Sequence, residues 1–143
     1  MPVIDADCHV IEADHTWAYL DAADEHLRPQ PYVSPDEPDE PFWLIDGSPA
    51  RRPFGAAARG TSSENQSGFA QTTMETRTLG DIKARLAHMD QLGVDVQVLY
   101  PTIYLTQISQ KPAVDLALAK SYNRWMADTW SQSDGRLRWV AVP

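Results

Sequence analysis

Short apolar runs alternate along the chain with stretches of helical periodicity. Strands are predicted near residues 2–9, 94–101 and 136–143, because each is a brief apolar run that is bounded by polar or turn-forming residues. Helices are predicted near 80–92 and 112–133, between these strands. The resulting order, strand, helix, strand, helix, strand, is typical of α/β folds in which parallel strands pair through crossover helices.

The two helices have recognisable ends. Asp81 is a suitable N-cap for the first helix, and Gly93 follows it at the position that favours a left-handed C-cap. Pro112 suits the first turn of the second helix. Positions with helical spacing are expected to share one side of each helix: the apolar Ile82, Leu86 and Met89 in the first, and Leu116, Ala119, Asn123, Met126 and Trp130 in the second.

A long insertion over residues 28–78 separates the first strand from the first of these helices. It follows a weakly helical stretch from Glu12 to Leu27 and begins with five prolines between Pro29 and Pro41, which predict an extended connection rather than a helix or an inner strand. Phe42–Ile45 followed by Asp46-Gly47 indicates a small hairpin. Gly55–Thr78 is poor in apolar residues and is predicted to be a mobile loop.

Two architectures fit this order of elements: an open doubly wound sheet and a closed (β/α) barrel. The glycine-rich phosphate-binding fingerprint, which nucleotide-binding sheets carry after their first strand, is absent here. Polar residues at the end of the first strand favour the barrel, because barrel enzymes carry their catalytic groups at the carboxyl ends of strands.

Those polar residues lie in the run Ile4-Asp5-Ala6-Asp7-Cys8-His9. Regular alternation along a strand places Asp5, Asp7 and His9 on one face, with Ala6 and Cys8 on the other. A carboxylate and an imidazole two positions apart can bind one divalent cation, and zinc accepts both ligand types. A hydrogen-bonded Asp–His pair at the end of a strand is the alternative.

Three stretches resemble the amidohydrolase-related family that includes aminocarboxymuconate-semialdehyde decarboxylase and γ-resorcylate decarboxylase. IDADCHVIEADHTW is similar to its first barrel strand, which ends in a metal-binding pair, and the pair matches Asp7 and His9. RLAHMDQLGVDVQVLYPT, and SYNRWMADTW with GRLRWVAVP, are similar to its next helices and strands. The resemblance implies the N-terminal part of a (β/α)8 TIM-type barrel and a divalent metal, with Zn as the first choice.

The resemblance also implies an incomplete site. The family takes further His and Asp ligands from later strands, and a barrel typically has about 250 residues. We therefore expect a C-terminal segment or a second polypeptide to complete the barrel and to supply the base. The implied reaction is hydrolysis or non-oxidative decarboxylation of a small carboxylic, possibly aromatic, substrate. The alternative is a non-catalytic half-barrel that binds and stabilises a partner.

Other residues near the strand ends are candidates for substrate binding: Glu12, Trp17, Tyr100 and Thr102. For Glu12 a solvated position is the competing interpretation, and for Trp17 it is core packing. Cys8 is expected to be a buried filler. Surface positions are expected for His15, His26 and His88, and Arg51, Arg52 and Arg59 are expected to serve solubility unless they bind a substrate carboxylate.

Charge and cysteine content narrow the possible partners. The formal net charge is −8 with no basic cluster, which argues against binding to nucleic acid or to an anionic membrane. A single cysteine excludes an intrachain disulfide, and the chain opens without a signal-peptide pattern. These features favour a cytoplasmic protein.

Overall fold

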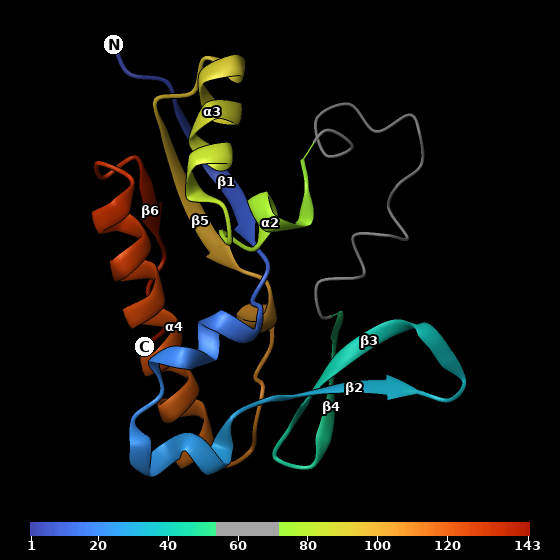
Figure 1. Ribbon diagram of the computed structural model, residues 1–143. Coiled ribbons are helices and arrows are strands. Elements are labelled where there is room, and N and C mark those ends of the chain that lie inside the picture. Colours follow the sequence, from blue (N-terminus) through green and yellow to red (C-terminus); the bar gives the residue numbers. More distant parts are fainter. Residues whose placement is uncertain (54–71) are drawn as a thin grey trace.

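The computed structural model describes residues 1–53 and 72–143. Within them, a parallel sheet has the strand order β1–β5–β6, formed by Ile4–Val10, Val96–Pro101 and Leu137–Trp139 (Figure 1). These strands lie in the three expected ranges, although β6 is shorter than its range. The parallel pairing predicted from the order of elements is present.

The helices α3 (Ile82–Leu92) and α4 (Pro112–Gln132) pack on one face of this sheet. Cys8, Val10, Leu99 and Leu137 point toward them and form the main core with side chains from both helices, including Met89, Tyr122, Trp125 and Met126. The opposite face of the sheet is more open, since Ile4 is 55% exposed there and Val98 is only half-buried.

The helix ends are as predicted. The Asp81 side chain accepts a hydrogen bond from the Ala84 amide at 2.9 Å, which satisfies a donor of the first turn of α3. Gly93 ends α3 in the left-handed region with φ 68° and ψ 29°. Pro112 occupies the first turn of α4, where its missing N–H is not needed.

The positions predicted to share one side of α4 do not all lie on its buried side. Leu116 is 53% exposed and Trp130 is 48% exposed, whereas Met126 is fully buried. The buried stripe shares Ala119 and Met126 with the predicted set, and it also contains Val114, Ala117, Leu118, Ser121, Tyr122, Trp125 and Thr129. Both stripes have helical spacing, so periodicity alone could not select the face that packs on the sheet.

Two short 3-10 helices replace the weak helix expected over Glu12–Leu27. They are η1 (Asp14–Tyr19) and η2 (Ala22–Leu27), and the chain is extended at Leu20 and Asp21 between them.

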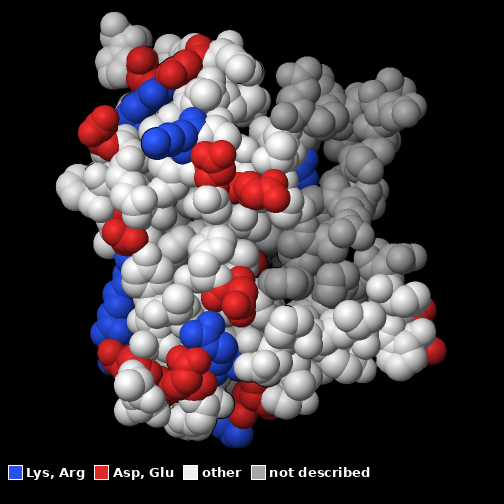
Figure 2. Space-filling view, in the orientation of Figure 1, with Lys and Arg blue, Asp and Glu red and all other residues white. Residues whose placement is uncertain are grey.

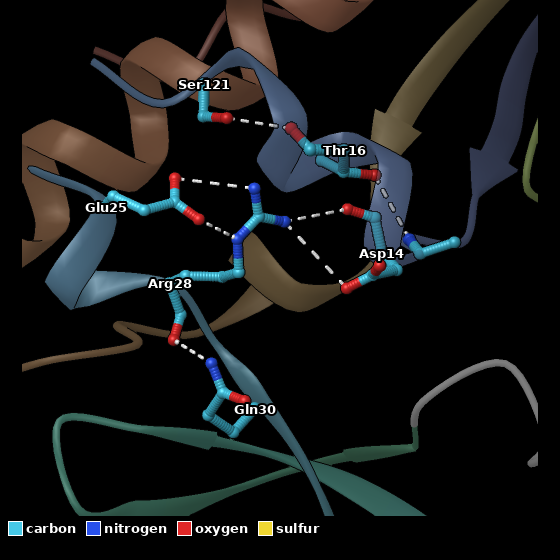
Figure 3. Close-up of polar contacts among 7 residues, drawn as sticks. Asp14, Thr16, Glu25, Arg28, Gln30 and Ser121 are labelled. Carbon is cyan, nitrogen blue, oxygen red and sulfur yellow. Dashed lines mark hydrogen bonds and ion pairs between the residues drawn. The ribbon is translucent and has the colours of Figure 1, made fainter. Parts of the chain in front are cut away.

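Figure 3 shows the contacts that fix these helices. The Arg28 guanidinium lies between the carboxylates of Glu25 and Asp14. The buried Ser121 hydroxyl of α4 donates to the Thr16 carbonyl at 2.8 Å. Because these contacts join η1 and η2 to each other and to α4, they set the direction in which the chain leaves toward the insertion.

The start of the insertion is an antiparallel sheet, formed by β2 (Gln30–Ser34), β3 (Glu37–Ile45) and β4 (Ser48–Pro53) (Figure 1). The hairpin at Asp46-Gly47 is confirmed, with φ of 50° and 74° at the two residues. The expectation that the proline-rich stretch contains no inner strand is wrong, because β3 is the central strand. Pro38 and Pro41 lie in β3 at positions without a paired residue in either neighbour, where a missing amide donor costs little.

This second sheet docks on the body of the chain through its β3–β4 end. Trp43 and Ile45 are buried against Trp17 and Leu118, and the two indole rings meet edge to face with centroids 5.8 Å apart. At the turn, the Asp46 carboxylate pairs with the Lys111 ammonium at 2.6 Å, just before α4. The insertion is therefore anchored to α4 by both apolar and charged contacts.

Most of the predicted mobile loop, Gly55–Thr78, lies outside the described residues. Its last part is ordered, which the composition did not predict, because α2 (Met74–Arg77) forms one helical turn there. Thr73 caps it by accepting from the Thr76 amide. Thr76 and Thr78 are both buried, so hydroxyl groups with local hydrogen bonds take the place of apolar residues.

On the face shown in Figure 2, acidic and basic side chains lie close together rather than in large separate patches. No helix in the described part of the chain is long and apolar enough to cross a membrane.

Candidate functional site

The second half of β1 presents Asp7 and His9 outward. Both are exposed, whereas the intervening Cys8 is 8% exposed and the following Val10 is fully buried. Asp7 and His9 thus lie away from the helix-covered face, toward the open face of the sheet. The His9 ring lies next to that of Tyr100 on β5, with centroids 6.0 Å apart, in agreement with the pairing of these residues in register.

Asp5 does not share this face, contrary to the regular alternation expected for β1. The register shifts between Asp5 and Cys8: three steps along β1 correspond to two along β5, from Gln97 to Leu99. This bulge turns Asp5 toward the helices, where its carboxylate accepts a hydrogen bond from the Cys8 thiol at 2.8 Å. Strict alternation of side chains fails here, because one extra residue in a strand reverses the faces to which the residues on either side of it point.

Cys8 and its neighbours form a polar group beneath the helices. Arg85 is 7% exposed, and its Nε donates to the Gln97 side chain at 2.8 Å. Burial, with the Asp5 carboxylate as a further cause, raises the pKa of the Cys8 thiol to about 12. The thiol is therefore protonated at neutral pH and not a nucleophile, which agrees with its expected role as a filler.

Glu12 is 2% exposed, which excludes the solvated position considered for it. Its two carboxylate oxygens accept hydrogen bonds from the backbone amides of Thr102 at 3.0 Å and Ile103 at 3.1 Å. Burial raises the pKa of Glu12 to about 7, and these amide bonds oppose the shift. Glu12 thereby fixes the segment that follows β5.

Thr102 contributes to the same connection. Its hydroxyl donates to the Val10 carbonyl at 2.7 Å, while its amide is held by Glu12. The segments that leave β1 and β5 are thus tied together at the carboxyl ends of both strands. The described contacts of Glu12 and Thr102 hold these segments in place, and a direct contact of either residue with a substrate stays a prediction.

Trp17 is fully buried in the cluster that anchors the insertion, so packing explains its position; a role at a pocket wall stays a prediction. Among the histidines, His15 and His26 are exposed and His88 is half-buried. His15 also contacts the Thr78 carbonyl at 2.8 Å and packs edge to face on Trp125. The side chains of Arg51, Arg52 and Arg59 lie outside the described part of the structure.

A pocket of about 350 Å³ opens beside Tyr100. Its walls come from the segment after β5, which includes the short helix η4 (Ile103–Leu105), from the first half of α4, and from residues 140–143 after β6. Two of its residues, Tyr104 and Asp115, carry buried oxygen atoms without a hydrogen-bond partner in the described part of the chain. Sequence reasoning missed both, because only the fold brings residues of three separate segments together.

Asp7 and His9 supply the oxygen and nitrogen donors that a divalent cation such as zinc accepts, and both are accessible. Two side chains alone do not complete a metal site. Among the described residues there is no group of three or more His, Cys, Asp or Glu side chains that could hold a metal ion. The donor types fit a metal, and further ligands would have to come from outside the described part.

No protein-family model matches the chain, and no curated protein matches it. Among solved structures, the chain is similar to the crystal structure of an amidohydrolase from Mycobacterium avium subsp. paratuberculosis K-10, with a TM-score of 0.58 and 17% sequence identity. The match covers 98% of this chain and 42% of the amidohydrolase, so the chain spans less than half the length of that protein. At this identity the likeness concerns the fold: a mixed α/β structure with a parallel sheet, of the kind found in an amidohydrolase.

Proposed function

We propose that the chain is the N-terminal part of a metal-dependent (β/α)-barrel enzyme of the amidohydrolase type, related to the decarboxylases of that group. The reaction would be hydrolysis or non-oxidative decarboxylation of a small carboxylic substrate. Asp7 and His9 would hold a divalent ion, most simply Zn²⁺, which as a Lewis acid polarises a substrate oxygen or activates water.

The observation that carries this proposal is the placement of Asp7 and His9. Both are exposed at the carboxyl-terminal half of a parallel strand, on the side opposite the helix layer. In (β/α) barrels this side is the interior, and the carboxyl ends of the strands form the active-site mouth. The fold of the similar amidohydrolase structure supports the same arrangement.

The rest of the barrel would come from a further segment or a second polypeptide. Parallel sheets are normally covered on both faces, yet α3 and α4 pack on one face and Ile4 on the other is 55% exposed. Later strands would cover this open face, bring the remaining metal ligands toward Asp7 and His9, and supply the general base.

Tyr100 is the residue that we assign to substrate contact. Its ring lies beside that of His9, and Tyr100 is also one of the residues that line the described pocket. Glu12 and Thr102 act on the substrate indirectly, because they fix the segment after β5 on which this part of the pocket depends.

The test is zinc binding by the purified protein in its native assembly, measured by competition with a chromogenic chelator. We expect one tightly held ion per chain, and His9→Ala and Asp7→Ala should each weaken its binding by at least about tenfold, the lower end for loss of a group that supports a metal site. His26→Ala is the matched control, because His26 is exposed on η2 and its ring contacts the Ala23 carbonyl of the same turn.

The result that contradicts the proposal is zinc binding in His9→Ala and Asp7→Ala equal to that in the His26→Ala control. A native assembly that binds no metal at all would instead support the non-catalytic half-barrel. If the ion is bound as expected, release of CO₂ from a carboxylic substrate separates decarboxylation from hydrolysis.

A further inference from the structure

The pocket beside Tyr100 is largely apolar. Leu105, Ile108, Ala119, Val140 and Val142 line it, together with Tyr100 and Tyr104. Its volume of about 350 Å³ is at the lower end of small-molecule sites, which span about 300–1,000 Å³. The walls therefore suit a single ring or a short branched chain.

Polar groups with unmet hydrogen bonds lie in its walls. Asp115 is in the first turn of α4, and its Oδ1 is buried without a partner in the described part of the chain. The buried Tyr104 hydroxyl also has no partner there. Buried polar atoms are rarely left unpaired in native structures, so these two oxygens are hydrogen-bonding groups of the wall that the described contacts leave unused.

The electrostatic character of this region is negative. Among the described residues that line the pocket, Asp115 has an acidic side chain and none is Lys, Arg or His. Burial holds the pKa of Tyr104 well above its usual value, and the nearby carboxylates of Glu12 and Asp115 add to this effect. A carboxylate entering the pocket would meet the same repulsion, whereas a cation would be attracted.

The pocket is next to the proposed metal ligands. Tyr100 lines it, and the Tyr100 ring lies 6.0 Å from the His9 ring between centroids. Tyr100 therefore connects the pocket wall with the end of β1 that carries His9.

We propose that the pocket binds an apolar group that carries an amine, and that this group is the non-reacting end of the substrate. The ammonium pairs with the Asp115 carboxylate and donates a hydrogen bond to the Tyr104 oxygen. The apolar walls hold the ring or chain. The assignment to a substrate depends on the proposed function, but the preference of the pocket for an amine does not. The acyl or carboxylic group of the same molecule would face Asp7 and His9.

The test uses three probes of one shape and different charge at pH 7: benzylamine, benzyl alcohol and phenylacetate. Their binding to the purified protein is followed by ¹⁵N chemical-shift perturbation, with the backbone amides of Ala141 and Val142 as reporters in the pocket wall. We expect benzylamine to bind about tenfold more tightly than benzyl alcohol, the size of one hydrogen bond to a charged group, and phenylacetate to bind most weakly.

Asp115→Asn should remove the advantage of benzylamine and leave the binding of benzyl alcohol nearly unchanged. Asp134→Asn is the control: it makes the same change of charge at an exposed residue beyond the opposite end of α4. Unperturbed amide shifts away from the pocket show that each variant is folded.

Two outcomes overturn the inference: phenylacetate binding at least as tightly as benzylamine in the unmodified protein, or Asp115→Asn retaining the full preference for benzylamine. Because no metal is needed in this experiment, its failure is separate from that of the proposed function. Loss of zinc binding to Asp7 and His9 with an intact amine preference would refute the metal proposal alone.

Discussion

Replacing Glu12 with glutamine removes an ionisable group that is 2% exposed and bonded to two backbone amides. Burial raises the pKa of Glu12 from its ordinary 4.5 to about 7. The folded protein therefore holds this proton more tightly than the unfolded chain does. The stability that Glu12 contributes is highest below pH 4.5 and falls as the pH rises toward 7, because the buried carboxyl group ionises.

The size of this effect follows from the shift. The pKa of Glu12 rises from 4.5 to about 7. At about 1.4 kcal/mol per pKa unit, this corresponds to a loss of roughly 3 kcal/mol of unfolding free energy between pH 4 and pH 8. Glu12→Gln cannot ionise, so the difference in unfolding free energy between variant and parent should move by this amount in favour of the variant. Rearranged hydrogen bonds to the Thr102 and Ile103 amides add an offset that depends little on pH.

The assay is urea unfolding followed by tryptophan fluorescence at several pH values from 4 to 8, for the parent, Glu12→Gln and the control Glu75→Gln. Glu75 is exposed in the first turn of α2, so its removal should leave the pH dependence unchanged. Taking the difference between variant and parent cancels the other titrating groups. Parallel curves for Glu12→Gln and the parent over this range would refute the reasoning.

Three further substitutions test the fold. Asp81→Ala removes the side chain that caps the Ala84 amide. It should lower the free energy of unfolding, measured with urea, by about 1 kcal/mol. Gly93→Ala places a Cβ at φ 68° in open space, so backbone strain alone should cost about 1 kcal/mol in the same assay. Ile4→Lys places a charge on the open face of the sheet and should weaken the native assembly in sedimentation velocity, whereas Leu92→Lys, equally exposed at the end of α3, should not.

The sequence was most informative where a local rule decides the structure. The Asp81 cap, the Gly93 end of α3 and the Asp46-Gly47 turn each depend on a few neighbouring residues, and each was predictable. The exposure of His9 also follows from local alternation, because regular pairing resumes at Cys8, whereas Asp7 lies within the irregular part of β1.

The remaining features depend on pairing and packing between distant segments. The bulge that turns Asp5 toward Cys8 becomes visible only against β5. The burial of Glu12 results from amides that lie 90 residues away in sequence, and the pocket around Asp115 joins three segments. Such contacts leave no periodic signal in the chain.

The edge-to-face pair of Trp17 and Trp43 gives the insertion an optical signature. The two indoles come from η1 and β3, and at 5.8 Å with an interplanar angle of 85° their electronic transitions should couple. Circular dichroism of such a pair contains an exciton couplet that neither tryptophan produces alone. Because the pair forms only when the antiparallel sheet is docked, this couplet would follow undocking of the insertion separately from unfolding of the parallel sheet.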